Sequence, residues 1–598
     1  MSRSPALWRI LVRTRATSRV LDFRRDRTIV CFDCTVTLVA ETPTQGCGMK
    51  KWVPVLILGC AQFVMVLDST VMNVSISTVV VDLHTTVAAM QTAITFYTLT
   101  MAAMMLFGAK LGDVWGRRRA FMVGSVIYAC GSLITALSPN FIVLFVGWSI
   151  IEGLGAVLVI PAIAALVANN YEGHDRVTAY AIIGAISGAA VAAGPLIGGF
   201  LTTYLSWRYV FFGEVVIMAA VYLFARFVAD TSRPENIRID FASVLLSAAG
   251  LVLVVYAMLQ TKVWGWILPK NPPVIAGHAI EPLGLSLVPY FFVAGGFVLW
   301  LFFVRQRYLV ARGRAPLLQV SMFAVKQLRA GLSVLAAQYA VTAGMFFMIP
   351  VYLQMTLGYN ALDTGLKIFP LSVAIIIFSI VGTRLTAIWP PRRIVRVGRL
   401  ILTASSVALL ASVSLDLKSI VFGFGMFFAG AGLGLLASQL GNVNMSSVGE
   451  EQSSEVGGLQ GVLQNLGSSL GTALIGSILI ASLATSFAGG VAASDLPSAV
   501  KSQVTTQTQS GIAIVPVSNV PHIAEKAGLS SSQAAQLATI YSDSQVSALR
   551  VSFFGLVLVS IVSLLFSKNI PAEVSGRKEP GPPRRKSRKP ERRGSTAT

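Results

Sequence analysis

Long apolar runs dominate the pattern of this chain, and they recur about fourteen times with short polar segments between them. Each run is long enough to cross about 30 Å of hydrocarbon as a helix. The pattern therefore predicts an all-α polytopic membrane protein. The expected spans are 53–75, 91–109, 120–137, 141–168, 178–201, 208–228, 241–260, 287–304, 330–350, 365–388, 398–415, 419–440, 456–482 and 548–566.

Composition agrees with this pattern. Hydrophobic residues make up 54% of the 598 positions and charged residues only 12%, with a mean hydropathy of +0.71. Soluble domains carry roughly 25% charged residues, about twice this density. The composition thus favours a membrane protein over a soluble one.

The distribution of positive charge predicts the orientation in the membrane. With 47 Lys and Arg against 26 Asp and Glu, the net charge is +21. If the N-terminus is cytoplasmic, most basic residues fall on cytoplasmic loops, as membrane proteins prefer. An even number of spans then places both termini in the cytoplasm. Nucleic-acid binding is disfavoured because the basic residues are scattered over short loops. The cytoplasmic set comprises Lys110, Arg117, Arg118, Arg119, Arg176, Arg226, Arg233, Arg238, Arg305, Arg307, Arg312, Arg314, Lys326, Arg329, Arg392, Arg393, Arg396 and Arg399, against Arg208, Lys262, Lys270 and Lys418 outside.

A short internal repeat indicates two related halves. Each copy follows the second span of a six-span unit, and the two copies align without gaps. Two six-helix bundles then remain, with spans 241–260 and 287–304 as an inserted pair, a build common among secondary transporters. Chance recurrence of basic loop residues is the alternative. The aligned positions are Gly108, Leu111, Trp115, Arg118 and Arg119 in the first copy and Gly382, Leu385, Trp389, Arg392 and Arg393 in the second.

The expected organisation has five parts. Residues 1–48 contain many arginines and no span, and Met49-Lys50-Lys51 would make a more natural start, so this extension is either disordered or mis-assigned. The basic, proline-rich tail is expected to be disordered and cytoplasmic. The parts are the extension 1–48, a six-helix bundle 49–230, the inserted pair 231–315, a second bundle 316–570 with a partly helical external loop 483–547, and the tail 571–598.

Asp68 is an acidic residue inside the first apolar run. A carboxylate at membrane depth is costly, so such a residue usually serves an ion or proton pathway. Burial in an apolar medium lets a carboxyl hold a proton, which it releases when water reaches it from the other side. The alternative is structural: a carboxyl hydrogen-bonded to Ser69, Thr70 or Asn73 within its own helix.

The segment Gly108–Arg119 joins the second and third spans. Its glycines permit a tight turn, and Asp113 can pair with an arginine or cap a helix N-terminus. We expect this segment to latch helices together during a conformational change; a plain basic turn is the alternative. Its candidate residues are Gly108, Gly112, Asp113, Gly116, Arg117, Arg118 and Arg119.

The fifth span is rich in glycine and contains Pro195. Glycines allow two helices to approach closely, and a proline bends a helix. Packing alone would account for these residues; a pliable helix that controls leak between two open states is the functional alternative. The candidate residues are Gly188, Gly194, Pro195, Gly198 and Gly199.

Together these motifs resemble those of the major facilitator superfamily, and within it the fourteen-span drug:proton antiporter family. Leu67–Val74 is similar to that family's first-helix motif, Gly108–Arg119 to the loop motif of the superfamily, and Ala193–Gly199 to the antiporter motif. The resemblance covers about residues 50–570. It implies the major facilitator fold and exchange of a small molecule for protons across the cell membrane.

Two acidic residues depart from the family's pattern. Its fourth helix usually carries an arginine, whereas this chain has Glu152 in that span and Glu214 in the sixth. Either carboxyl can be a further protonation site, a partner for a cationic substrate, or a satisfied structural group. For Glu214 a structural role has support, because Arg208 lies about one and a half turns away.

The expected function is proton-coupled efflux of drugs or other lipophilic small molecules by alternating access. The alternatives are a proton symporter or uptake carrier, a lipid or metabolite exporter on the same fold, and a membrane scaffold. No phosphate-binding loop of an ATP-driven pump is present. We expect a monomer with no enzymatic activity, cofactor or nucleic-acid partner. We also expect no metal site, since the histidines are far apart, at His84, His174, His278 and His522.

Overall fold

The computed structural model describes residues 50–230, 239–275, 278–445, 447, 453–498, 500–502, 514–566 and 570. The predicted extension 1–48 and tail 571–598 lie outside these residues. The helices from α1 (Val53–Asp82) onward belong to one unit that begins at Trp52.

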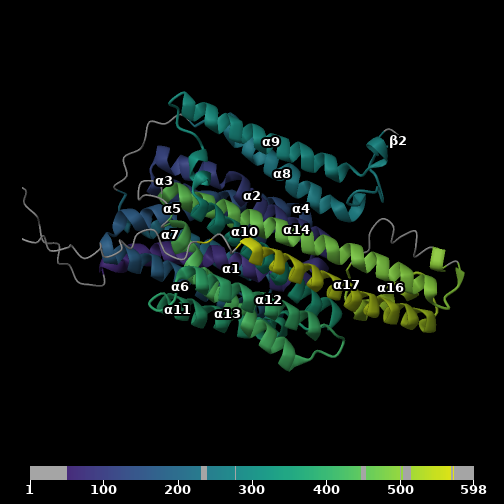
Figure 1. The fold of residues 1–598 in the computed structure, drawn as a ribbon. Coiled ribbons are helices and arrows are strands. Elements are labelled where there is room, and N and C mark those ends of the chain that lie inside the picture. The colour runs from purple at the N-terminus through teal and green to yellow at the C-terminus, as the bar shows by residue number, and fades with distance from the viewer. Residues whose placement is uncertain are drawn as a thin grey trace, which may run out of the picture. The chain divides into compact units, whose positions relative to one another are not determined.

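The described residues are almost entirely helical, with one two-stranded hairpin in which Val274 pairs with Ala279 (Figure 1). The first part of the chain contains η1 (Lys50–Trp52), α1, α2 (Val87–Trp115), α3 (Arg117–Ala136), α4 (Phe141–Leu144), the π-helix η2 (Phe145–Glu152), α5 (Gly153–Asn170), α6 (Gly173–Tyr204), α7 (Arg208–Phe224) and η3 (Ala225–Phe227). The middle contains α8 (Phe241–Trp264), β1 (Val274–Ile275), β2 (His278–Ala279), η4 (Pro282–Gly284), α9 (Leu287–Ala311) and η5 (Val320–Ala324). The last part contains α10 (Lys326–Val351), η6 (Tyr352–Thr356), α11 (Ala361–Leu385), α12 (Pro391–Ser412), α13 (Ser419–Met445), α14 (Ser453–Ala493), η8 (Val517–Asn519), α16 (Val520–Lys526) and α17 (Ser531–Phe566).

Fourteen of the described helices are long and apolar enough to cross a membrane, which confirms the predicted fold class. The largest differences from the predicted spans are at helix ends. α14 continues to Ala493 and α17 begins at Ser531, so both helices extend into the predicted loop 483–547. At about 1.5 Å per residue, a helix of 41 residues is about 60 Å long, twice the thickness of the hydrocarbon layer.

Side-chain caps fix where several of these helices begin. Thr86 accepts a hydrogen bond from the backbone of Ala89 at 3.1 Å and starts α2. Asn360 does the same for the backbone of Asp363 at 2.7 Å and starts α11. Such caps satisfy amide groups that the first helical turn leaves without a partner.

The spans form two bundles that meet along two helix pairs. Within the first bundle α1 packs on α6, and α3 packs on α5 and α7; within the second, α10 packs on α14 and α11 packs on α13. Between the bundles α2 packs on α14 and α6 packs on α11. The amide of Gln91 donates to the backbone oxygen of Thr472 at 3.1 Å across the first pair. The amide of Gln354 donates to the backbone oxygen of Val74 at 2.7 Å from the other bundle.

The inserted helix α8 packs on α2 and α14, and α9 packs on α8, away from α11 and α13 (Figure 1). Asp240, just before α8, accepts two hydrogen bonds from the Arg305 guanidinium of α9, at 2.6 and 2.7 Å. This paired guanidinium lowers the pKa of Asp240 to about 2. Next to it Gln306 accepts from the backbone of Leu317 at 2.8 Å, which holds the chain leading to the second bundle.

Several residues assigned to cytoplasmic loops lie within helices instead, among them Lys110 and Arg305, and Arg399 is buried as well. Arg399 lies within α12 and is only 2% exposed. Its guanidinium donates to the backbone oxygen of Val334 on α10 at 2.7 Å and to that of Ser563 on α17. The loop assignment is wrong because the apolar run that follows Arg399 hides the fact that α12 begins eight positions earlier, at Pro391.

Candidate functional site

Three acidic side chains from three different helices converge inside the first bundle. Asp68 comes from the middle of α1, Glu152 from the end of η2, and Glu214 from α7. Each is almost completely buried, and one carboxyl oxygen of each lies within 4.8 Å of the others. The three residues that the sequence singled out separately therefore form one acid cluster.

Trp148 holds the Asp68 carboxyl in place. Its indole Nε1 donates to both oxygens of Asp68, at 2.9 and 3.1 Å. The ring of Tyr97, on α2, stacks on that of Trp148 with centroids 4.9 Å apart. The indole is completely buried, so its orientation is fixed by packing as well as by the hydrogen bonds. Sequence reasoning missed Trp148, because an aromatic residue in a span ordinarily indicates packing.

A π-helical stretch carries both Trp148 and Glu152. The segment Phe145–Glu152 interrupts the fourth span with the wider π geometry, which is rare and often occurs at functional sites. Residues four apart lie on the same face of a helix, so Trp148 and Glu152 both face the first span. The sequence carries no clear signal for a π-helix.

Glu152 is held close to α3, where Gly131 leaves room for its backbone. A Cβ on Gly131 would lie 2.5 Å from the Glu152 backbone nitrogen, so only glycine permits this approach. Neither carboxyl oxygen of Glu152 has a hydrogen-bond partner in the described part of the chain, although the hydroxyls of Tyr128 and Ser132 are neighbours. A buried polar group in this condition is costly unless it can gain a proton, a water or a ligand.

Glu214 is not neutralised by Arg208, contrary to the structural alternative. It accepts a hydrogen bond from the Ser132 hydroxyl at 3.1 Å. Arg208 instead pairs with Asp82 at the end of α1 and donates to the backbone oxygen of Ser138 at 2.9 Å. Trp207 donates to the same Asp82 at 3.0 Å, so this arginine is engaged away from the acid cluster.

The structural alternative for Asp68 also fails. Ser69 and Thr70 donate to backbone oxygens of α1, and the Asn73 amide donates to the backbone oxygen of Ser69 at 2.6 Å. None of them bonds the Asp68 carboxyl. Asp68 is therefore held by a different helix rather than by its own.

The electrostatics of the acid cluster favour protons. Among the described residues, no lysine or arginine forms an ion pair with any of the three carboxyls. Two negative charges 4.8 Å apart repel by about 3–4 kcal/mol even at an effective dielectric constant near 20. The three groups therefore cannot all be ionised while they are packed together.

A divalent cation fits this cluster less well than protons do. Mg²⁺ demands about six oxygen ligands in near-ideal geometry and keeps several waters. The three carboxyls would supply three ligands and leave one negative charge in excess. The acid cluster is therefore better suited to binding protons than to binding a metal ion.

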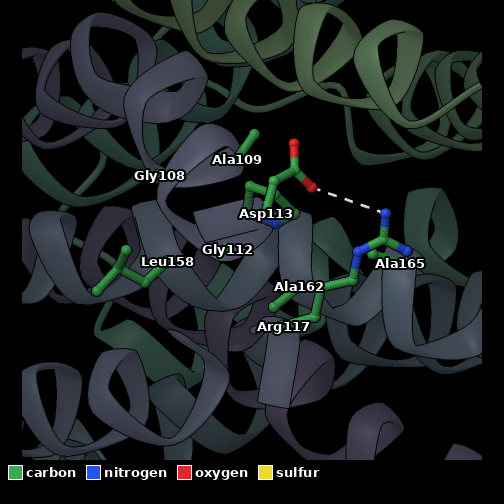
Figure 2. A pocket seen from close by; sticks show the side chains of 9 residues that line it. Gly108, Ala109, Gly112, Asp113, Arg117, Leu158, Ala162 and Ala165 are labelled. Atoms are coloured by element: carbon green, nitrogen blue, oxygen red, sulfur yellow. Dashed lines mark ion pairs between the residues drawn. The ribbon is translucent and has the colours of Figure 1, made fainter. Parts of the chain in front are cut away.

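The predicted turn at Gly108 and Gly112 is helix instead, because α2 continues to Trp115. Asp113 lies in the last turn of α2 and faces Arg117, the first residue of α3 (Figure 2). The Arg117 guanidinium lies 3.7 Å from the Asp113 carboxylate, and Lys110 lies 3.9 Å from it. Gly108 allows α2 to touch α5, since a Cβ there would lie 2.2 Å from the backbone oxygen of Val157. Gly108, Asp113 and Arg117 border a cavity of about 10 Å³, room for one water at most.

The N-terminus of α3 is capped from the segment after α7 rather than by Asp113. Asp230 accepts a hydrogen bond from the backbone of Arg118 at 2.9 Å, next to Gly116, which has a positive φ of 94°. Of the two roles expected for Asp113, the described contacts thus show pairing with Arg117.

The glycines of α6 connect the acid-bearing helix to the second bundle. A Cβ on Gly194 would lie 1.8 Å from the Thr70 hydroxyl of α1, and one on Gly198 would meet Val71. A Cβ on Gly199 would lie 2.7 Å from the backbone oxygen of Ala361 on α11. Gly188 has open space around it, so packing does not require a glycine there. Pro195 lies within α6, and its backbone oxygen faces Gly365 of α11.

The chain is similar to known membrane carriers over most of its length. The model of the Major Facilitator Superfamily matches residues 58–472. The chain is 30% identical to the puromycin resistance protein of Streptomyces alboniger, over 64% of this chain and 72% of that protein. It is 27% identical to the tetracenomycin C resistance and export protein of Streptomyces glaucescens, over 71% and 74% of the two chains. It is also 27% identical to the drug efflux pump JefA of Mycobacterium tuberculosis, over 70% and 78%.

Among solved structures, the fold resembles a bacterial homolog of the human lysosomal transporter Spinster in an inward-facing, unoccupied conformation. The TM-score is 0.55 at 16% identity, and the match covers 88% of this chain and 98% of that one. A peptide transporter matches with a TM-score of 0.52 at 14% identity, over 86% and 94% of the two chains. At these identities the likeness concerns the fold alone.

Proposed function

Since the chain belongs to the major facilitator superfamily of membrane carriers, which are not enzymes, we propose that it exports lipophilic small molecules from the cell in exchange for protons. Asp68 is the coupling residue, and Glu152 and Glu214 share its protons. The carrier operates in the cell membrane with both termini cytoplasmic.

The observation that carries this proposal is a buried acid cluster to which no lysine or arginine of the described residues is paired. Protons are the simplest charge that can enter and leave such a cluster, because the apolar surroundings and mutual repulsion penalise full ionisation. Protonation from the outside would compete with substrate binding. Deprotonation to the cytoplasm would reset the carrier.

The packing of α6 supports a link between protonation and conformation. Gly194 and Gly198 contact α1 within one turn of Asp68, and Gly199 contacts α11 of the other bundle. A small shift of α1 when Asp68 gains a proton would therefore move α6, and with it the contact between α6 and α11 that joins the two bundles. Alternating access requires such a link between ion binding and the relative movement of the two bundles.

The driving force is sufficient for export. A proton that crosses about 150 mV supplies roughly 3.5 kcal/mol, which sustains a several-hundred-fold gradient of a neutral substrate per proton. Relatives named for puromycin resistance and tetracenomycin C export make antibiotics the first substrates to test.

The experiment is efflux measured as uptake into everted membrane vesicles, after a drug-susceptibility panel has identified a substrate. We expect accumulation that depends on an imposed proton gradient and that an uncoupler abolishes. Asp68→Asn should reduce it to background, whereas Asp416→Asn, which removes an exposed acid, should leave it unchanged. Accumulation in right-side-out vesicles instead would support the alternative of a proton symporter, and proton-driven efflux at the wild-type rate in Asp68→Asn would contradict the assignment.

A further inference from the structure

A second feature lies on the outer surface of the first bundle, where α3 packs on α7. A groove of about 540 Å³ opens there, beginning near the start of α3 and running along it for about two turns. It is separate from the acid cluster, which faces the interior. Its lining residues are Trp115, Arg119, Met122, Val123, Val126, Ile127 and Tyr222.

The part of this groove farther along α3 is an apolar surface that faces the membrane. Val123 and Val126 are 41% and 45% exposed, although both belong to a membrane-spanning helix. A span exposes such side chains where lipid covers them. The groove's volume of about 540 Å³ leaves room for a hydrocarbon chain, and Val123, Val126 and Ile127 offer that chain no polar side chain.

The part of the groove nearest the start of α3 holds an arginine that has no partner among the described residues. Arg119 is exposed and forms no ion pair or hydrogen bond with the residues that the structure describes. Its neighbour Arg117 is paired with Asp113, and the backbone of Arg118 with Asp230. The sequence grouped Arg119 with the latch motif, but its side chain is directed to a different surface.

Two aromatic residues surround this arginine. Trp115 and Tyr222 line the same groove and are 44% and 39% exposed. Such amphipathic rings prefer the level of the lipid headgroups. Arg119, Trp115 and Tyr222 therefore mark the interfacial end of the groove, and the valines mark its hydrocarbon end.

The second copy of the internal repeat lacks this free charge. Arg393 corresponds to Arg119, and its guanidinium lies 5.0 Å from the ring centroid of Trp389, the counterpart of Trp115. That arginine is thus occupied by its own tryptophan. Unlike Arg393, the Arg119 guanidinium is therefore free to bind a ligand from outside the protein.

We propose that this groove binds one anionic phospholipid from the cytoplasmic leaflet. Its phosphate accepts from the Arg119 guanidinium and the Tyr222 hydroxyl, and one acyl chain lies along Val123 and Val126. A guanidinium near a membrane surface attracts anionic lipid, and a groove adds a place for the chain. Lipid binding here is independent of proton-coupled export.

The test is native mass spectrometry of the purified full-length protein with added phosphatidylglycerol or phosphatidylcholine. We expect one tightly held phosphatidylglycerol and a preference over phosphatidylcholine. Arg119→Gln should weaken phosphatidylglycerol binding about fivefold, the effect of one interfacial arginine. Arg393→Gln is the matched control and should leave it unchanged.

A second variant, Val126→Trp, fills the hydrocarbon end and should remove the bound lipid while Arg119 remains. Thermal unfolding in lipid-free detergent verifies that each variant is folded. Equal losses from Arg119→Gln and Arg393→Gln, or equal binding of the two lipids, would overturn the proposal. So would disulfide-linked dimers that form with Val126→Cys but not with wild type, which has the exposed Cys60 and Cys130, because the occupant would then be a second copy of the chain.

Discussion

The two bundles share a fold, but their buried charged residues have opposite signs. The first contains three buried acids, Asp68, Glu152 and Glu214, and no buried lysine or arginine among its described residues. The second contains one buried charge, Arg399, and no buried acid among the residues described there. Six residues beyond the repeated arginines, the first bundle has Ser125 where the second has Arg399.

The difference teaches which charges can change during a transport cycle. An arginine does not lose its proton in proteins, so Arg399 is a permanent cation solvated by backbone oxygens of α10 and α17. It ties three helices of its bundle together. Among the described residues the three buried carboxyls of the first bundle have no cationic partner, and in our proposal they exchange protons. We therefore assign proton handling to the first bundle and mechanical rigidity to this part of the second.

The largest effect on stability is expected from Arg399→Gln. The shorter amide cannot reach both Val334 and Ser563, so at least one buried hydrogen bond from a charged donor is lost, at a cost of about 1.5–3 kcal/mol. We expect lower yield and a lower thermal midpoint in detergent, with Arg393→Gln as the exposed control. The protein that still folds should retain its ratio of protons to substrate. A changed ratio would show that Arg399 takes part in coupling and would remove the contrast between the bundles.

Much of this contrast is visible in the sequence, but its geometry is not. An acid inside an apolar run is conspicuous, so sequence reasoning identifies Asp68, Glu152 and Glu214. Their convergence depends on the rotation of three helices relative to one another, which periodicity cannot give for spans that are apolar all round. The π-helix at Phe145–Glu152 also changes the rotation of the fourth span, and no pattern in the local sequence predicts by how much.

The three residues that sequence reasoning misses or misplaces, Trp148, Arg208 and Arg399, are hidden for similar reasons. Trp148 escapes sequence reasoning because its contact with the carboxyl of Asp68 joins residues that are 80 positions apart in the chain. By sequence distance Arg208 is a candidate partner for Glu214, yet its side chain points toward Asp82. Arg399 is assigned to a loop because hydropathy locates the apolar part of a span, whereas the helix itself can begin several residues earlier.

The next largest effect is expected from Trp148→Phe. Phenylalanine keeps the stacking with Tyr97 but removes the donor to the Asp68 carboxyl. A hydrogen bond to a charged group is worth about 1.5–3 kcal/mol, so coupled efflux should fall about ten- to hundredfold. Since the indole stabilises the ionised carboxyl, the remaining activity should require a more alkaline cytoplasmic side.

The measurement is the pH dependence of efflux in everted vesicles, with Trp300→Phe as a control at an exposed indole of α9. An unchanged profile in Trp148→Phe would mean that the indole only fills space.

A smaller effect is expected from Glu152→Gln and Glu214→Gln. Each amide mimics a permanently protonated carboxyl, so the acid cluster retains its shape but has one titrating group fewer. Coupled sites titrate together over a broad range of pH. We expect several-fold slower efflux and a simpler pH profile in either variant, measured by the same vesicle assay. Wild-type profiles in both would restrict proton binding to Asp68 alone.

The smallest effect concerns the inserted pair, which belongs to neither bundle. Asp240→Asn removes the paired contact with Arg305, a partly exposed interaction worth at most about 1 kcal/mol. Because the folded-state pKa of Asp240 is lowered to about 2, its stabilisation is present above the ordinary carboxyl range near 4 and is lost as the pH falls toward 2. Thermal unfolding of wild type and variant should differ slightly at pH 6 and converge near pH 2. A constant difference over that range would show that the ion pair contributes nothing to stability.

The most direct test of the central claim counts protons released when substrate binds. Purified protein in weakly buffered detergent is mixed with the drug identified by susceptibility testing, and the pH change is recorded beside the binding isotherm. Wild type and Asp416→Asn should release protons in proportion to bound drug. Asp68→Asn should bind the drug and release none. Undiminished proton release from Asp68→Asn would show that the coupling site lies elsewhere.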